Sequence, residues 1–459
     1  MSDLLGVKGM ARSQRLNLQQ RNTQHHNLQH ANRAGRVIRL LLGWFLLAGI
    51  AQEAIAQTPA PAPQPTSSPQ PSPPPAKPKP QLNEFPPNPL ELKTPDPLLP
   101  QGAPPRTLTE AEIQQLGPQL DRLNLEAAAQ LKSGERSKAF DTWNRELRLR
   151  RLTGLLPEVQ ALGRVGDVAW RQNQSPQVRV ITQRLDAILT LVQSPTFAAR
   201  PEAANRIALT DAIGLAYEQV RVPSSAASAY EQSLAEARQR QDGVKATATL
   251  NTLGQLYLGW FNYPKAAETY RELVTIAQGQ GDRTNEAFYL SQLAYTHEQA
   301  KQPQQATPYQ EKLLTIYQQT NTPNAIAPLQ IRLADNYQLA DQPAAAEKNY
   351  QAAYQLAQVQ TQYGYAAEAL RKLGRLYKAN DRLDAALRVY DYLVGVEQQA
   401  YNTYGMMTAY DAIGQIYLSR KAYPQAVSAF QQALALAKQL RYREDYFTAE
   451  IQKASAAGN

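Results

Sequence analysis

The residues whose types and spacing point most directly to binding chemistry are three bases, Arg371, Arg375 and Lys378. In an α helix, residues at i, i+4 and i+7 lie along one face, so these side chains form a basic stripe. Like charges at this spacing repel by roughly a few tenths of a kcal/mol, so something must offset them. The offset is either solvent together with Asp335 and Asp411 on flanking helices, or an acidic ligand held by charge-assisted hydrogen bonds. The second alternative predicts a site for an acidic peptide or a chain terminus.

Few residues in this chain are candidates for catalysis or for metal binding. It contains no cysteine, which excludes a thiol nucleophile, a disulfide framework and a zinc-thiolate site. His297 is the one histidine beyond residue 56, and it occupies a repeat position that otherwise holds tyrosine, which favours a packing role. No glycine-rich phosphate loop follows a strand pattern. We therefore predict a protein that is not an enzyme and that binds no cofactor and no metal.

A pattern that returns every 40 residues, six times, must position the basic stripe. Each unit has a small residue after an aliphatic one, a tyrosine three residues later in five of six units, and an alanine twelve residues later. The small residues are Gly214, Gly254, Ala294, Ala334, Gly374 and Gly414. The tyrosines are Tyr217, Tyr257, Tyr337, Tyr377 and Tyr417, and the alanines are Ala226, Ala266, Ala306, Ala346, Ala386 and Ala426. Such a register is typical of a repeat array, in which each unit buries its apolar face against the next.

Each unit is predicted to be a helical hairpin. The aliphatic, small and aromatic residues share one helical stripe, and the alanine and a second aromatic residue four positions later share another. A proline recurs between the stripes, at a place suited to the first position of a helix. That leaves roughly 15 to 18 residues per helix, with turns between units that include positions near Gly364 and Gly405. The small residues and alanines are interpreted as letting two backbones approach closely. The third unit, where His297 and Gln310 replace rings, is expected to be the loosest.

The pattern of Leu253, Gly254, Tyr257, Ala266 and Tyr270, with its counterparts, resembles the tetratricopeptide repeat family. The resemblance implies an all-α fold, a right-handed α-solenoid of helix-turn-helix repeats whose period is longer than usual. It also implies that a peptide or protein binds in a concave groove lined by the first helices. The groove positions lie three residues before, and one and four residues after, the small residue. Among them, the candidate binding residues are Asn251, Gln255, Tyr295, Asp335, Gln338, Arg371, Arg375, Lys378, Asp411 and Gln415.

The N-terminal part reads as targeting and spacer sequence. Residues 1–56 combine a basic lead, an apolar run and a small-residue site ending at Ala56, which predicts a cleaved secretory signal or, alternatively, an uncleaved membrane anchor. Residues 57–105 hold 19 of the 32 prolines and are predicted to be a disordered linker. The rest is predicted to comprise degenerate helical repeats in residues 106–201, six 40-residue repeats in residues 202–440, and a capping helix and tail in residues 441–459.

Charge and export together narrow the choice of partners. The formal net charge is +9, and without the signal it falls to about +4, because residues 1–39 contribute about +6 and Glu53 contributes −1. A small, dispersed excess argues against nucleic-acid binding. We predict an exported scaffold in the periplasm, or an equivalent lumen, of a bacterium, which binds a protein or peptide and touches membrane only through an uncleaved N-terminal segment. The alternatives are a structural envelope protein that binds glycan or self-assembles and, more remotely, a hydrolase or transglycosylase.

Overall fold

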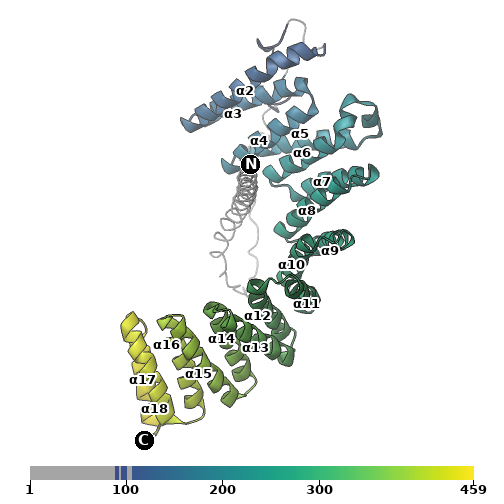
Figure 1. The fold of residues 1–459 in the computed structure, drawn as a ribbon. Coiled ribbons are helices and arrows are strands. Elements are labelled where there is room, and N and C mark those ends of the chain that lie inside the picture. Colours follow the sequence, from purple (N-terminus) through teal and green to yellow (C-terminus); the bar gives the residue numbers. More distant parts are fainter. Residues whose placement is uncertain (1–87, 93–94, 101–105, 459) are drawn as a thin grey trace, which may run out of the picture. The chain divides into compact units, whose positions relative to one another are not determined.

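The protein is known from a computed structural model that describes residues 88–92, 95–100 and 106–458, and the predicted all-α solenoid is confirmed over them (Figure 1). These residues form seventeen α helices and three short 3₁₀ helices, and none of them lies in a strand. The N-terminal elements are α2 (Glu110–Lys132), α3 (Arg136–Arg150), η1 (Arg151–Thr153), α4 (Leu155–Arg171), α5 (Ser175–Gln193), η2 (Pro195–Ala199) and η3 (Pro201–Asn205). The array follows as α6 (Arg206–Gln219), α7 (Pro223–Gln239), α8 (Gly243–Gly259), α9 (Tyr263–Gly279), α10 (Arg283–Gln299), α11 (Pro303–Gln319), α12 (Pro323–Leu339), α13 (Pro343–Val359), α14 (Tyr363–Ala379), α15 (Leu383–Gln399), α16 (Thr403–Ser419), α17 (Tyr423–Leu440) and α18 (Glu444–Gly458).

The turns of the array repeat every 20 residues, half the period of the sequence pattern. One residue of each turn is left-handed, with φ of 66° at Gly281 and between 48° and 63° at the others. These positions are Arg221, Gln241, Phe261, Gly281, Lys301, Asn321, Asp341, Thr361, Asp381, Tyr401, Lys421 and Arg441. The hydrogen bonds that close the turns, such as Asp242 N to Ala237 O at 2.9 Å, are those of a Schellman motif. The turns predicted near Gly364 and Gly405 centre on Thr361 and Tyr401, and the two glycines themselves lie in the first turns of α14 and α16.

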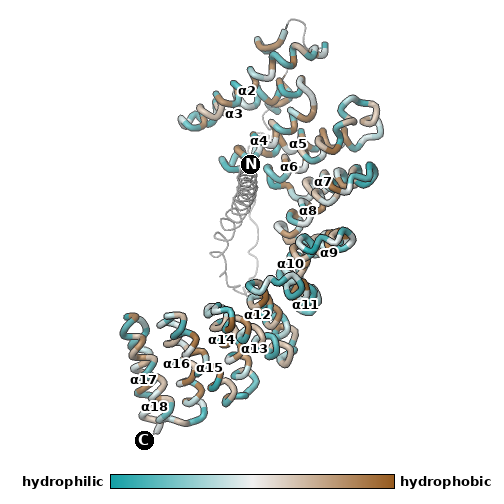
Figure 2. Tube along the Cα trace, viewed as in Figure 1, coloured by the Kyte–Doolittle hydropathy of each residue, from teal (hydrophilic) through white to brown (hydrophobic). Residues whose placement is uncertain are grey.

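Each repeat glycine makes room for an aromatic ring of the second helix. A Cβ atom at Gly214 would lie 2.7 Å from the ring of Tyr230, and one at Gly374 would lie 2.7 Å from the ring of Tyr390. Gly254 and Gly414 face the rings of their own hairpins in the same way. The small residue was interpreted as a place of backbone contact, but the close neighbour is the ring. The buried alanines twelve residues on complete the interior, and hydrophobic and hydrophilic segments alternate along the helices (Figure 2).

The tyrosine three residues after the small one joins its unit to the unit before. Tyr257 Oη of α8 donates to Glu231 on α7 at 2.5 Å, and Tyr377 Oη of α14 donates to Glu347 on α13 at 2.7 Å. Burial, and then the Glu231 carboxylate, raises the pKa of Tyr257 to about 12. The repeat tyrosine is thus both a core residue and a polar fastener between units. In the third unit His297 takes this place and stacks on a neighbouring tyrosine ring instead.

The described residues include part of the segment predicted to be a linker. Leu90 is only 2% exposed, and Asp96 accepts a hydrogen bond from Arg145 Nε at 2.7 Å. This hydrogen bond holds the pKa of Asp96 below its usual range. Arg148 also donates to the carbonyl of Pro89 at 2.7 Å. The predicted linker is therefore too long at its C-terminal end, because residues before position 101 pack on α3. The predicted signal in residues 1–56, and the linker up to residue 87, lie outside the described residues.

Candidate protein-binding face

The predicted binding residues lie on the first helices of the six hairpins, α6, α8, α10, α12, α14 and α16. We call their positions, three before and one and four after the small residue, the first-helix face. Gln255, Tyr295, Gln338, Arg375 and Lys378 are exposed on it. The other candidates are half-buried, because each bonds to a side chain of a neighbouring helix. Their exposure follows from helical phase, since the small residue and the aliphatic residue before it point into the core.

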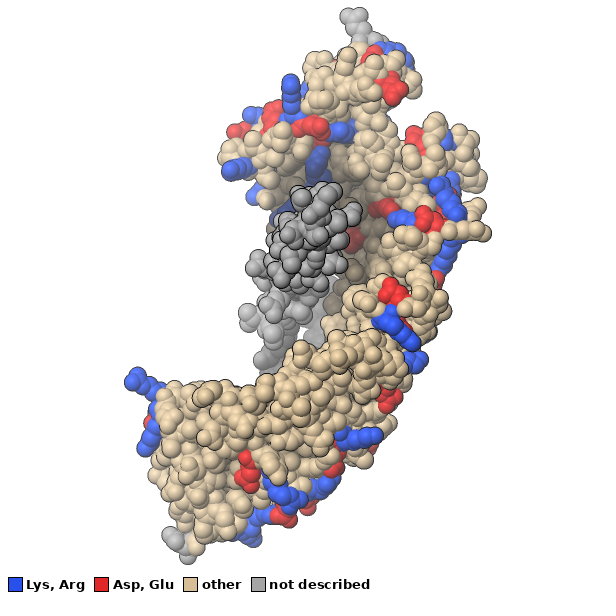
Figure 3. All heavy atoms as spheres, in the orientation of Figure 1, with Lys and Arg blue, Asp and Glu red and all other residues tan. Residues whose placement is uncertain are grey.

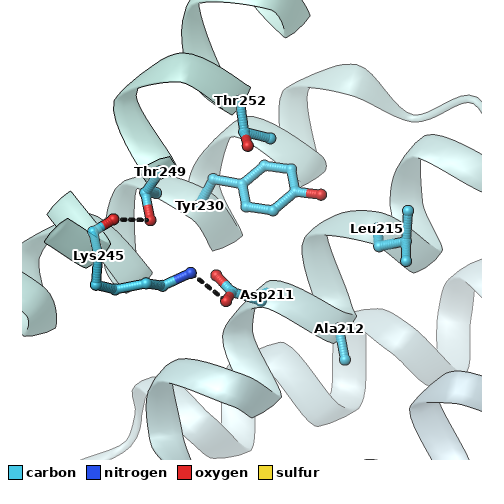
Figure 4. A pocket seen from close by; sticks show the side chains of 7 residues that line it. All are labelled: Asp211, Ala212, Leu215, Tyr230, Lys245, Thr249 and Thr252. Carbon is cyan, nitrogen blue, oxygen red and sulfur yellow. Dashed lines mark hydrogen bonds and ion pairs between the residues drawn. The ribbon is translucent and has the colours of Figure 1, made fainter. Parts of the chain in front are cut away.

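Acids on the first-helix face bind bases from the following unit. Asp211 forms an ion pair with Lys245, which lies 34 residues later, and Figure 4 shows the two side chains pointing toward each other. Asp335 pairs with Lys372 at 2.7 Å and also accepts a hydrogen bond from Tyr350 at 2.6 Å. These pairs hold neighbouring first helices together, and they neutralise the acids that a ligand would otherwise meet. The bases, which lie 34 and 37 residues after their acids, were missed from the sequence.

The positive charge of Arg371, the first residue of the basic stripe, is neutralised by an acid of its own hairpin. Arg371 pairs at 2.6 Å with Glu397 of α15, whose side chain is 1% exposed. The other carboxylate oxygen of Glu397 accepts from Asn402 at 2.8 Å. Asp335 and Asp411, the acids considered as offsets, instead bind Lys372 and Arg443. Arg371 is thus committed to a buried partner.

Two cations of the stripe remain available. Arg375 and Lys378 are exposed, and neither makes a hydrogen bond or ion pair with any of the described residues. They lie one helical turn apart on α14, which places their Cβ atoms about 5–6 Å from each other. An anionic group could therefore reach both without displacing an existing partner.

The first helix of the sixth hairpin, α16, is covered by the C-terminal helix, α18. Tyr446 of α18 donates to Asp411 at 3.0 Å, and Gln415 donates to Tyr446 at 3.0 Å and to Glu450 at 3.0 Å. Burial raises the pKa of Asp411, although Tyr446, Arg443 and Gln415 act in the opposite direction. Asp411 and Gln415 were predicted to bind a ligand, and both are engaged by α18 in this structure. The capping helix thus occupies the place that a further repeat would take.

Two hollows lie between consecutive first helices. One, of about 280 Å³, is lined by Asp211, Tyr230 and Lys245 between α6 and α8 (Figure 4). The other, of about 500 Å³, lies between α10 and α12 beside Glu298 and Asp335. Both are open and lined largely by groups that already have partners, so they fit a partner's side chains better than an enclosed small molecule.

The remaining candidates contribute neutral polar groups. Asn251 donates from its amide to Tyr289 Oη at 2.8 Å, across the junction between α8 and α10. Gln255 and Tyr295 are exposed without such a bridge, and Gln338 accepts a hydrogen bond from Tyr350 of its own hairpin at 3.2 Å. The described residues contain no cluster of three or more histidines, aspartates and glutamates that could hold a metal ion. Among the same residues, no helix combines the length and the apolar character needed to cross a membrane.

The hairpins and their bridged first helices define a helical-repeat solenoid. Residues 409–444, which contain the C-terminal part of α16 and all of α17, match the tetratricopeptide repeat family. The resemblance predicted from the repeat pattern is confirmed. No curated protein matches the chain.

Several solved structures are similar in fold. BtubC (BKLC) from P. vanneervenii is 20% identical, with a TM-score of 0.34 over 49% of this chain and 91% of that chain. MamA is 21% identical, with a TM-score of 0.32 over 41% of this chain and 98% of that chain. The apo form of RapI is 11% identical, with a TM-score of 0.37 over 73% of this chain and 97% of that chain. At these identities the likeness concerns the fold alone.

Proposed function

We propose that the chain is an interaction scaffold that holds an acidic segment of a protein partner on α14. The observation that carries the proposal is the pair Arg375 and Lys378, exposed and without partners among the described residues. The acids Asp211, Asp335 and Asp411 of the same face are each bound to a base, so the uncompensated charge in this part of the face is positive.

The spacing of the two cations also suggests the form of the ligand. Their Cβ atoms are separated by about 5–6 Å along the helix. In an extended peptide, two residues on the same side are about 6.5 Å apart, because each residue advances the chain by about 3.3 Å. A glutamate, any residue and a second glutamate would therefore present one carboxylate to each cation. Both contacts would be charge-assisted hydrogen bonds, which are stronger than neutral ones.

The test is fluorescence anisotropy with a labelled peptide in which glutamate and serine alternate. We expect the full chain to bind this peptide, to lose binding when glutamine replaces glutamate, and to bind less as salt is raised. Reversing both cations, R375E with K378E, should weaken binding at least tenfold. A matched double reversal on the second helices, R271E with K312E, changes the net charge equally at two exposed sites and should leave binding unchanged. Equal binding by the two double variants would refute the site.

We also propose that the chain is exported, so that the scaffold acts outside the cytoplasm. The support is the basic lead, the apolar run from Leu40 to Ala51 and the small-residue site ending at Ala56. N-terminal sequencing of the chain recovered from fractionated cells tests this directly. A mature chain that starts at Gln57 in the soluble envelope fraction is the expected result. A full-length chain in the membrane fraction would indicate anchoring, and one in the cytoplasm would refute export.

A further inference from the structure

Three consecutive turns between units carry no charged residue, and this distinguishes them from the other turns. Residues 313–331, 349–367 and 398–410 contain no Asp, Glu, Lys or Arg. They include the turns from α11 to α12, from α13 to α14 and from α15 to α16. The two earlier turns of the same kind, from α7 to α8 and from α9 to α10, are charged, with Asp242 and Asp282 among their residues.

The charge-free turns produce a visible neutral surface. In Figure 3 the face over α12 to α17 is almost free of charged side chains, whereas charges gather along the opposite edge of the same helices. The turns within these hairpins, unlike those between units, contain charged residues, for example Asp381, Arg382 and Arg420. A water-exposed surface normally mixes both signs of charge. The absence of charged side chains from this surface over three units therefore needs an explanation.

Tyrosines stand on this neutral surface with little structural role. Tyr401, in the turn before α16, is 94% exposed, and Tyr404, at the start of α16, is 52% exposed. Tyr365, at the start of α14, is also exposed. The ring of Tyr404 lies 6.0 Å from that of Tyr442, where the neutral surface ends. We call Tyr365, Tyr401 and Tyr404 the tyrosine edge.

Tyr401 shows most clearly that packing does not explain the edge. Its backbone is left-handed, with φ of 54°, a conformation that costs an ordinary residue about 1–2 kcal/mol relative to glycine. Its side chain makes no hydrogen bond or ring contact with the described residues. Phe261, at the equivalent position of another turn, has a ring contact with Tyr263. A large aromatic side chain in a strained, fully hydrated position is a reason to look for a partner.

We propose that the tyrosine edge binds a neutral polysaccharide. The flat faces of sugar rings present C–H groups that stack on exposed aromatic rings, which bury apolar area on both sides. Sugar hydroxyls both donate and accept hydrogen bonds, as does the amide of the exposed Gln398 beside the edge. A charged partner would meet no counter-charge on this surface, so electrostatic complementarity favours a neutral one.

The edge is separate from the cations on the first-helix face. Arg375 and Lys378 lie near the C-terminal end of α14, whereas Tyr365 lies at its N-terminal end. At about 1.5 Å per residue, ten residues place the two sites about 15 Å apart along the helix. The polysaccharide site and the proposed peptide site therefore do not depend on each other, and each can fail alone.

The test is co-sedimentation of the full chain with four insoluble neutral polysaccharides: cellulose, curdlan, chitin and cross-linked dextran. We expect at least one of them to pellet the chain, and carboxymethylated cross-linked dextran to pellet no more than the neutral dextran. Changing Y401A together with Y404A should reduce the pelleted fraction at least tenfold at limiting polysaccharide. Both side chains are exposed, so circular dichroism should be unchanged.

The matched control is Tyr392→Ala, which removes a tyrosine that is 63% exposed on α15. It should leave pelleting unchanged, and an equal loss in this control would refute the edge as the site. Failure of all four neutral polysaccharides would also refute the proposal. Sedimentation velocity tests whether a second copy of the chain occupies the edge instead. If the full chain binds no polysaccharide and forms a dimer that dissociates in the Y401A/Y404A variant, the edge is a dimer interface and the proposal is refuted.

Discussion

The close approach of Tyr390 to Gly374 predicts how a single methyl group changes stability. A Cβ atom at Gly374 would lie 2.7 Å from Cε1 and Cζ of the Tyr390 ring, so the ring or the helix must move. Overpacking of this kind costs about 1–3 kcal/mol. Alanine also gains about 0.8–1 kcal/mol over glycine in helix propensity. The variant G374A should therefore be between equally stable and about 2 kcal/mol less stable than the parent.

A second glycine of the same hairpin isolates the packing cost. Gly395 lies on α15, and a Cβ atom there would meet nothing within 4 Å. The variant G395A should gain the propensity term alone, about 0.8–1 kcal/mol. The difference between the two variants is then the overpacking cost, about 1–3 kcal/mol. Urea unfolding followed by circular dichroism measures both, and equal stability of G374A and G395A would refute the role assigned to the ring.

A double change tests whether Tyr390 is the residue that clashes. Replacing the ring with leucine in G374A should restore part of the loss, with a favourable coupling of about 0.5–3 kcal/mol between the two sites. The fourth unit sets a limit on the effect, because it has Ala334 in the small position and Tyr350 in the ring position. That hairpin accommodates both side chains, so the cost at Gly374 reflects adjustment and not loss of the fold. Additive effects of the two changes would contradict the proposed contact.

Three further predictions concern pH, turns and the buried carboxylate. Burial raises the pKa of Tyr257 and Tyr270 to about 12, from an ordinary 10.0. The stability that these two groups contribute should therefore be fully present below about pH 10 and should be lost as the pH rises to about 12. Tyrosinate absorbance should rise together with the loss of helical ellipticity. Thr361 is β-branched at φ 56°, so T361G should raise stability by about 0.5–1 kcal/mol in urea unfolding, and a loss would contradict the turn geometry. E397Q removes the charge that pairs with Arg371, which is 35% exposed, and should cost about 1–2 kcal/mol; a cost that persists in an R371M background would show that the pair is not responsible.

The repeating part of the fold was accessible from the sequence because its residues recur in a constant phase. The period, the hairpins and the buried positions of Gly254, Tyr257 and Ala266 follow from that phase alone. The geometric period of 20 was not accessible, because left-handed turn residues such as Phe261 and Tyr401 are not glycines. Sequence patterns reveal turns best where the residue type matches the conformation.

The candidate site was less accessible, because partners of a charged side chain come from other helices. Arg371 looked like a ligand-binding cation, but Glu397 lies 26 residues later and is buried against it. Nothing in the local pattern distinguishes this acid from a solvated one. Arg375 and Lys378 could be selected only after the pairs around them were known. The sequence thus indicates which residues face outward, and the structure decides which of them are free.

The third unit shows how a buried polar residue can take the place of the repeat ring. Gln310 is fully buried, donates to Glu298 at 2.7 Å and accepts from Asn336 at 2.9 Å. Glu298 is bound in turn by Arg332 at 2.6 Å, so this network links the second helix of the unit to the next first helix. Pro308 removes one backbone donor of α11, and the Thr307 hydroxyl lies 3.3 Å from the carbonyl that loses its partner.

The network also marks a boundary within the array. The large buried apolar clusters divide here, one ending with Leu329 and the other beginning with Ala327 and Ile331. Buried hydrogen bonds depend on geometry more strongly than apolar contacts do, because a partly broken network leaves unpaired groups in a low-dielectric interior. A small displacement between α10 and α12 therefore costs more of the local stability than the same displacement between all-apolar units. Because each repeat contacts only its neighbours, we infer that the array opens first at this junction, with intact hairpins on both sides.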